Sequence, residues 1–179
     1  MAERYISPDH VIAGEEYLDA LIKLGLEPTF CAWVNDPTSD EPVLLVVTPI
    51  FDVAGPLELQ KLLFRAYNAS ATPRLINPFM VRVQSPRDQM MRELLAAIDT
   101  KVTSYSISVQ EDDGTYTPYR EWVKGLGDEE DAPSTLYTVW GVSFTDQTIY
   151  LRPHAAGERG KPLSNQLRDF RRNVDRLAA

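Results

Sequence analysis

The chain has 179 residues, of which 44% are apolar and 25% charged, and a formal net charge of −8. A chain of this length buries roughly 70% of the surface that it exposes when unfolded, so one globular domain over residues 1–179 is expected. Its near-average composition excludes intrinsic disorder. The longest strongly apolar run, Val43 to Val47, is far short of the ~20 residues that span a bilayer, and residues 1–7 lack a signal-peptide core. We therefore expect a cytoplasmic protein without a membrane partner.

The charge is divided unevenly along the chain. Residues 152–179 hold seven basic and three acidic residues, whereas residues 1–151 hold eleven and twenty-three. Residues 152–179 therefore carry a net positive charge, whereas the rest of the chain, the acidic body, is negative. Acidic surfaces repel backbone phosphates, which argues against nucleic acid as the partner. A split charge distribution of this kind can instead orient a protein partner.

The first predicted element is a helix over residues 8–24. Ser7-Pro8 is typical of a helix start, apolar side chains then recur on one face, and Gly25 is a plausible stop. Two strands follow, Phe30 to Val34 and Val43 to Thr48, and we expect them to pair. The second of these is unbroken apolar, which indicates a strand that is buried rather than half-exposed.

A second helix, a strand and a third helix are predicted next. Gly55-Pro56 opens the second helix, whose apolar residues keep helical spacing and which ends near Ser70. Phe79 to Val83 alternates as a strand should. Ser85-Pro86 then repeats the Ser-Pro opening ahead of another helical stripe, so a third helix is expected to start there.

The second half of the chain is predicted to be rich in strands. From about residue 102 the apolar period changes to two, and Asp113-Gly114 is a strong hairpin signal. A further hairpin is expected to pair Leu136 to Phe144 with Thr148 to Arg152 around Asp146-Gln147. An amphipathic helix, about Leu163 to Leu177, closes the chain.

This element order predicts an α+β fold. Strands in runs with helices between them favour a mainly antiparallel, mixed sheet of about six to seven strands, with about four helices packed mostly on one face. A helix, hairpin, helix outline begins at Ser7 and again at Ser85. The two stretches do not match beyond their Ser-Pro pairs, so the outline alone does not establish an internal duplication.

A loop ahead of the last helix predicts an anion site. Four potential cations stand within ten residues there, at Arg152, His154, Arg159 and Lys161. Basic side chains leading into a helix N-terminus favour a phosphate or carboxylate. The loop is not a Walker A motif, because Ala155 and Pro162 occupy positions that need Gly and Ser or Thr. The alternative is that these cations are solvated, or pair with the acidic stretches 111–113 and 128–131 of the same molecule.

Asp52 is the carboxylate that the pattern favours as a functional group. It follows the predicted buried strand and precedes Gly55-Pro56. Ligand groups in α/β sheets stand where strands end, so Asp52 is a candidate to act with the loop cations. The alternative is a turn or cap role.

Other chemistry finds little support in the residue pattern. His10 and His154 lack the spacing of metal ligands, and Cys31 stands alone in a predicted strand, so no metal and no cofactor is expected. No nucleophile elbow is present. The three tryptophans can form a base-stacking platform, but core packing is the simpler interpretation of Trp33, Trp122 and Trp140.

These observations favour a non-enzymatic binding or regulatory module that interacts with another protein. The rival hypothesis is an enzyme or sensor for a small anionic ligand, held by the 152–161 loop, with His154 or Asp52 handling a proton. A third interpretation is nucleic-acid binding through the basic stripe of the last helix, at Arg168, Arg172 and Arg176. Neither the partner nor the oligomeric state follows from the sequence.

Overall fold

The fold contains four α-helices and eight strands among the residues that the computed structural model describes, which are 6–36, 38–39, 41–99, 108–110, 116–118, 136–139, 142–145, 148–151 and 162–177. The helices are α1 (Pro8–Leu24), α2 (Phe51–Asn68), α3 (Gln89–Asp99) and α5 (Leu163–Leu177), with a 3₁₀ turn, η1, at Pro78–Met80. The strands are β1 (Phe30–Val34), β2 (Val43–Val47), β3 (Val81–Gln84), β4 (Ser108–Gln110), β5 (Tyr116–Pro118), β6 (Leu136–Val139), β7 (Val142–Thr145) and β8 (Ile149–Leu151).

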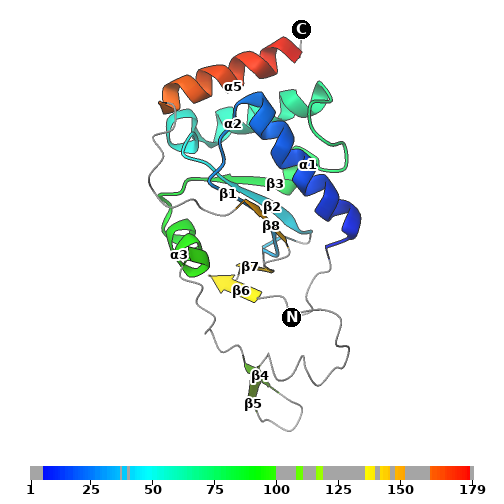
Figure 1. Ribbon diagram of the computed structural model, residues 1–179, viewed down its shortest axis with the longest axis vertical. Helices are drawn as coiled ribbons and strands as arrows, with labels where there is room; N and C mark the ends of the chain where they lie inside the picture. Colours follow the sequence, from blue (N-terminus) through cyan, green and yellow to red (C-terminus); the bar gives the residue numbers. More distant parts are fainter. Residues whose placement is uncertain are drawn as a thin grey trace.

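A mixed sheet of four strands, in the order β3-β2-β1-β8, forms the centre of the molecule (Figure 1). β1 is antiparallel to both β2 and β8, and β2 is parallel to β3. β7 is joined to the end of β1 by one bridge, between Asn35 and Ser143. The prediction of an α+β fold with four helices and a mixed sheet is confirmed. The expected six to seven strands are wrong, because the sheet has only four strands, or five with β7.

Strand pairing differs from the prediction in the last part of the chain. β6 pairs with β7, and β8 pairs with β1 rather than with the strand before it. A long-range hydrogen bond supports this pairing. Thr148, the residue before β8, donates from its Oγ1 to the Trp33 carbonyl at 3.1 Å. β4 and β5 pair as the predicted hairpin around Asp113-Gly114 requires, and that turn itself lies outside the described residues.

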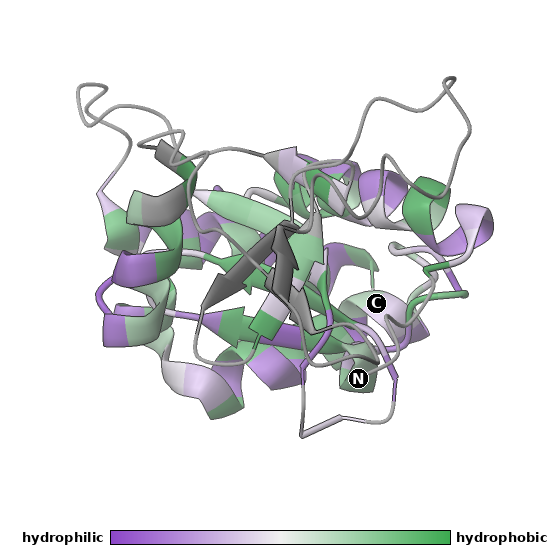
Figure 2. Cartoon of the chain, turned by 90° about the horizontal axis from the view of Figure 1, so that it is seen from below, coloured by the Kyte–Doolittle hydropathy of each residue, from purple (hydrophilic) through white to green (hydrophobic). Residues whose placement is uncertain are grey.

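The two central strands are buried on both faces. Every residue of β1 and β2 is buried. Alternate side chains point to opposite faces of a strand, so the odd and even positions belong to different cores. Trp33 and Leu44 pack into one core, and Phe30 and Leu45 pack into the other. Figure 2 shows green, apolar residues along these central strands. A sheet of this kind needs a covering layer on each side.

Different elements cover the two faces of the sheet. α1, α2 and α5 pack with Trp33 and Leu44 on one face, where they contribute Tyr17, Leu63 and Phe170. α3 and β7 cover the other face, which they close with buried apolar side chains at Met91, Leu94, Ile98, Val142 and Phe144. In Figure 1 the three helices lie above the sheet and α3 lies below it. Three of the four helices therefore share a face.

Local signals set the ends of α1 and the course of α2. Ser7 Oγ accepts a bond from the His10 backbone N–H, and Gly25 adopts a left-handed conformation, φ 94°, that ends the helix where the sequence predicts. α2 contains a break at Gly55, whose φ of 74° is not helical. Its continuous part therefore begins at Pro56, and a single preceding turn starts at Phe51.

Ser85 does not open α3 as predicted. The helix starts at Gln89, and Asp88 Oδ1 accepts bonds from the backbone N–H groups of Met90 and Met91 at 3.0 and 3.4 Å. Ser85 Oγ is engaged elsewhere, because it donates to Asp52. The Ser-Pro pair therefore forms a turn, and the carboxylate three residues later caps the helix. β3 also starts two residues after the predicted strand, because Pro78–Met80 forms the 3₁₀ turn.

Gly14 sits where α1 lies closest to the sheet. A Cβ at this position would be 2.4 Å from Tyr150 Oη and 2.6 Å from Trp33 Nε1. Both atoms donate to carbonyls of α1, Tyr150 to Val11 at 2.7 Å and Trp33 to His10 at 2.9 Å. The absence of a side chain at Gly14 therefore permits two bonds that fasten α1 to β1 and β8.

Gly14→Ala is expected to destabilise the protein by about 1–3 kcal/mol, because the new methyl group displaces Trp33 and Tyr150. This sign is opposite to the usual effect, since Ala is favoured over Gly in a helix by about 1 kcal/mol. Urea unfolding measures the change. Asp19→Ala, on an exposed position of the same helix, is the control and should stay within about 0.5 kcal/mol of the parent. A neutral or stabilising Gly14→Ala would contradict the close approach.

Candidate functional site

Of the five residues of the predicted anion site, the structure describes only Asp52. Arg152, His154, Arg159 and Lys161 lie outside the described residues. Asp52 is described, and it lies in the first turn of α2. Whether the five residues come together therefore stays a prediction.

Asp52 stands beside the carboxyl ends of the parallel strands β2 and β3. Ser85 Oγ donates to its Oδ1 at 2.6 Å, and Arg87 Nε lies 3.4 Å from its Oδ2. Ser85 Oγ also accepts a bond from the Arg87 backbone N–H at 3.0 Å. Both carboxylate oxygens are thus engaged within the protein, and the Asp52 side chain is only 22% exposed. This geometry fits a carboxylate that ties the start of α2 to the turn after β3.

His10 and Trp33 also make their contacts within the protein. The His10 ring packs edge-on against Trp33, with centroids 5.6 Å apart, and its Nδ1 lies 2.7 Å from Ser7 Oγ. Trp33 is fully buried and bonded to α1, so it is a core residue, as expected. Trp122 and Trp140 lie outside the described residues.

Tyr17 of α1 and Cys31 of β1 are buried together in the core between that helix and the sheet. Burial raises the pKa of the Cys31 thiol well above its ordinary value near 9, and it raises the pKa of the Tyr17 hydroxyl well above 10. Cys31 is fully buried and makes no disulfide. The thiolate is the reactive form of cysteine, so a protonated and buried thiol is inert.

The outer face of α2 is a feature that the sequence analysis missed. Leu57 is 68% exposed, and Phe79 of the neighbouring η1 turn is 84% exposed. The Phe79 ring packs edge-on against Phe64 of α2, with centroids 5.0 Å apart. Gln60 Nε2 donates to the Pro78 carbonyl at 2.8 Å and so fastens η1 to α2. We refer to Leu57, Lys61, Phe64 and Phe79 as the α2 outer face.

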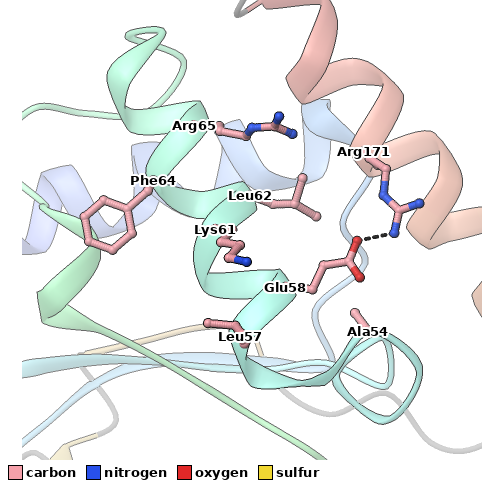
Figure 3. A pocket seen from close by; sticks show the side chains of 8 residues that line it. All are labelled: Ala54, Leu57, Glu58, Lys61, Leu62, Phe64, Arg65 and Arg171. Carbon is pink, nitrogen blue, oxygen red and sulfur yellow. Dashed lines mark hydrogen bonds and ion pairs between the residues drawn. The ribbon is translucent and has the colours of Figure 1, made fainter.

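A groove of about 820 Å³ runs along this face and reaches α5 (Figure 3). Its lining is mixed, with apolar side chains at Ala54, Leu57, Leu62 and Phe64 and charged ones at Glu58, Lys61, Arg65 and Arg171. Figure 3 shows Leu57 and Phe64 on the side of α2 away from α5, Glu58 and Arg65 on the side toward α5, and Lys61 between them. The groove therefore has an apolar edge and a charged edge.

Two ion pairs of opposite sense join α2 to α5 at the charged edge. Glu58 of α2 pairs with Arg171 of α5, and Arg65 of α2 pairs with Asp175 of α5 at 2.7 Å. Beneath them, Leu62 and Phe170 belong to the same buried core. Exposed ion pairs contribute little stability, so packing holds the helices together and the charges shape the surface.

The basic stripe predicted on the last helix is present on the surface of α5. Arg168, Arg172 and Arg176 are all exposed. Arg172 pairs with Asp169 at 2.9 Å. Together with Arg171 and Asp175, these three arginines line a shallow depression of about 460 Å³. The solvated side of a core helix thus continues the charged edge of the groove.

The described residues contain neither a metal-binding cluster nor a membrane-spanning helix. They hold no group of three or more histidine, cysteine or acidic side chains arranged to bind a metal ion. None of the helices within them combines the length and apolar character that a membrane span needs.

Comparison with protein-family models, with curated proteins and with solved structures gives no match.

Stability is expected to fall as the pH rises above 9. In the unfolded chain Cys31 loses its proton near pH 9, whereas in the native protein the buried thiol keeps it. The native state then binds more protons, which lowers the free energy of unfolding by up to about 1.4 kcal/mol per pH unit. Cys31→Ala removes this contribution and should flatten the dependence between pH 9 and 10, measured by urea unfolding. Parallel curves for the parent and Cys31→Ala would contradict the burial of the thiol.

Ser85→Ala is expected to destabilise the protein by about 1 kcal/mol, because Asp52 loses its hydroxyl donor. Arg87→Ala should cost less than about 0.5 kcal/mol, since the Arg87 side chain is 80% exposed. Thermal and urea unfolding of the two variants measure the difference. If Ser85→Ala left the free energy of unfolding unchanged, Asp52 would not depend on this turn for its position.

Proposed function

We propose that this protein is a non-enzymatic binding module that docks another protein on the α2 outer face. The observation that carries the proposal is the 84% exposed Phe79, packed edge-on against Phe64 next to the groove that Leu57 lines. Isolated exposed apolar residues are ordinary on protein surfaces, whereas clustered ones are typical of interaction sites.

The contacts of Phe79 support a binding role. Its backbone N–H donates to Asn77 Oδ1 at 2.9 Å, and its ring is held by Phe64. An aromatic side chain that already packs against a neighbour loses less conformational freedom when a partner covers it. Aromatic residues of this kind carry a large share of the energy at protein interfaces.

The walls of the groove favour a protein over a small ligand. Small-molecule sites usually enclose most of the ligand surface in a concave, largely apolar pocket. Here Leu57 is 68% exposed, and Arg65 and Arg171 are about half exposed. A surface built from exposed side chains on two helices is better suited to the broad contact of a protein interface.

A photo-reactive amino acid placed at Leu57 or at Phe79 is expected to form covalent adducts with a partner protein inside the cells that produce this chain. The same residue at Ile12, which is 59% exposed on α1, is the matched control and should give no such adduct. Adducts are detected by gel shift and identified by mass spectrometry.

A second substitution makes this test specific. Leu57→Asp should abolish crosslinking from position 79, because a desolvated anchor contributes about 2 kcal/mol or more to binding. The same change should alter the free energy of unfolding by less than about 0.5 kcal/mol, since Leu57 is exposed in the free protein. Adducts that persist in Leu57→Asp, or that appear equally from Ile12, would refute the proposed face.

A further inference from the structure

We infer that the partner segment bound by this protein is an amphipathic helix with acidic residues along one flank. The inference rests on the proposed function and adds the chemistry of the occupant. Two independent features of the groove support it, the sign of its charged edge and the spacing of its apolar edge.

The charged edge of the groove is positive. Lys61, Arg65 and Arg171 line the groove with a single carboxylate, Glu58, and Arg65 pairs with a second one, Asp175, beside it. No ion pair of Lys61 is found among the described residues. Arg65 and Arg171 each meet one carboxylate, although a guanidinium has five N–H donors, so both keep donors for a further anion.

The surface of α5 extends this positive charge. The cations of the groove and of α5 are Lys61, Arg65, Arg168, Arg171, Arg172 and Arg176, and the carboxylates among them are Glu58, Asp169 and Asp175. Six cations and three carboxylates leave this face positive, on a chain whose net charge is −8. Charge complementarity therefore selects an acidic partner, and it disfavours a symmetric dimer in which this positive face meets the same face of a second copy.

The apolar edge has the spacing of a helix contact. Leu57 and Phe64 are seven residues apart on the continuous part of α2, which is about 10 Å along the helix axis. A partner helix lying along α2 presents apolar side chains at the same interval, from positions i and i+7. Because the charged edge runs beside the apolar edge, the acidic residues of that helix fall on the flank that faces Lys61 and α5.

Two designed peptides test the inference. Each has about 18 residues, which is long enough for an isolated helix, with Leu at i, i+4, i+7 and i+11. The remaining positions are Glu and Ala in one peptide, and Lys and Ala in the other. Fluorescence anisotropy with the full chain at low and high salt measures both affinities. We expect the acidic peptide to bind at least about tenfold more tightly, with the preference reduced by salt.

Charge reversal on the protein provides the matched control. Lys61→Glu should weaken binding of the acidic peptide and strengthen binding of the basic one. Arg92→Glu makes the same type of change on α3, on the opposite face of the sheet, and should leave both affinities unchanged. Leu57→Asp should weaken the binding of both peptides, because both use Leu57 as their apolar anchor.

The outcomes separate the two proposals. Equal binding of both peptides that is lost in Leu57→Asp keeps the docking face and overturns the acidic helix. Failure of both peptides to bind also overturns the proposal of an acidic partner helix. In that case the crosslinking from Leu57 and Phe79 still tests the proposed docking face independently. Sedimentation completes the test, since a dimer of the parent that dissociates in Leu57→Asp identifies a second copy as the occupant and overturns the inference.

Discussion

The burial of β1 and β2 on both faces is the constraint on which the rest of the structure depends. All ten residues of these two strands are buried, so each side of the sheet has to be closed by another layer. α1, α2 and α5 close one side, and α3 with β7 closes the other. The same need explains why β8 returns to β1, because a buried strand with unpaired N–H and C=O groups on its second edge would be unstable.

The covering layer also creates the surface that we propose as functional. α2 uses Leu59, Leu62 and Leu63 to cover the sheet and to seat α5, which leaves its opposite side free. Leu57 and Phe79 are thus not needed for the core and stay in contact with water. The helix that closes the chain adds arginines to the same surface, so binding chemistry is placed on the outermost layer and does not interrupt the packing below.

Elements with local signals could be predicted from the sequence, and features that depend on distant residues could not. α1 follows from Ser7 and its apolar stripe, whereas the identical Ser-Pro signal at Ser85 fails because Asp52, distant in sequence, binds its hydroxyl. The pairing of β8 with β1 joins segments that no turn connects. The α2 outer face was missed because hydropathy does not distinguish Leu57, which faces water, from Leu59, which faces the core.

The distance in sequence between β1 and β8 has a consequence for the chain during its synthesis. Thr148 and Trp33, which are bonded across this pair, are 115 residues apart. Ribosomes add about 5–20 residues per second, so β1 waits roughly 6–23 s for its second neighbour. During that interval the nascent chain carries an apolar strand with an open edge, which is the kind of template that recruits other unfolded chains. Late synthesis of the segment that contains β8 therefore makes folding sensitive to local concentration and to chaperones on the ribosome.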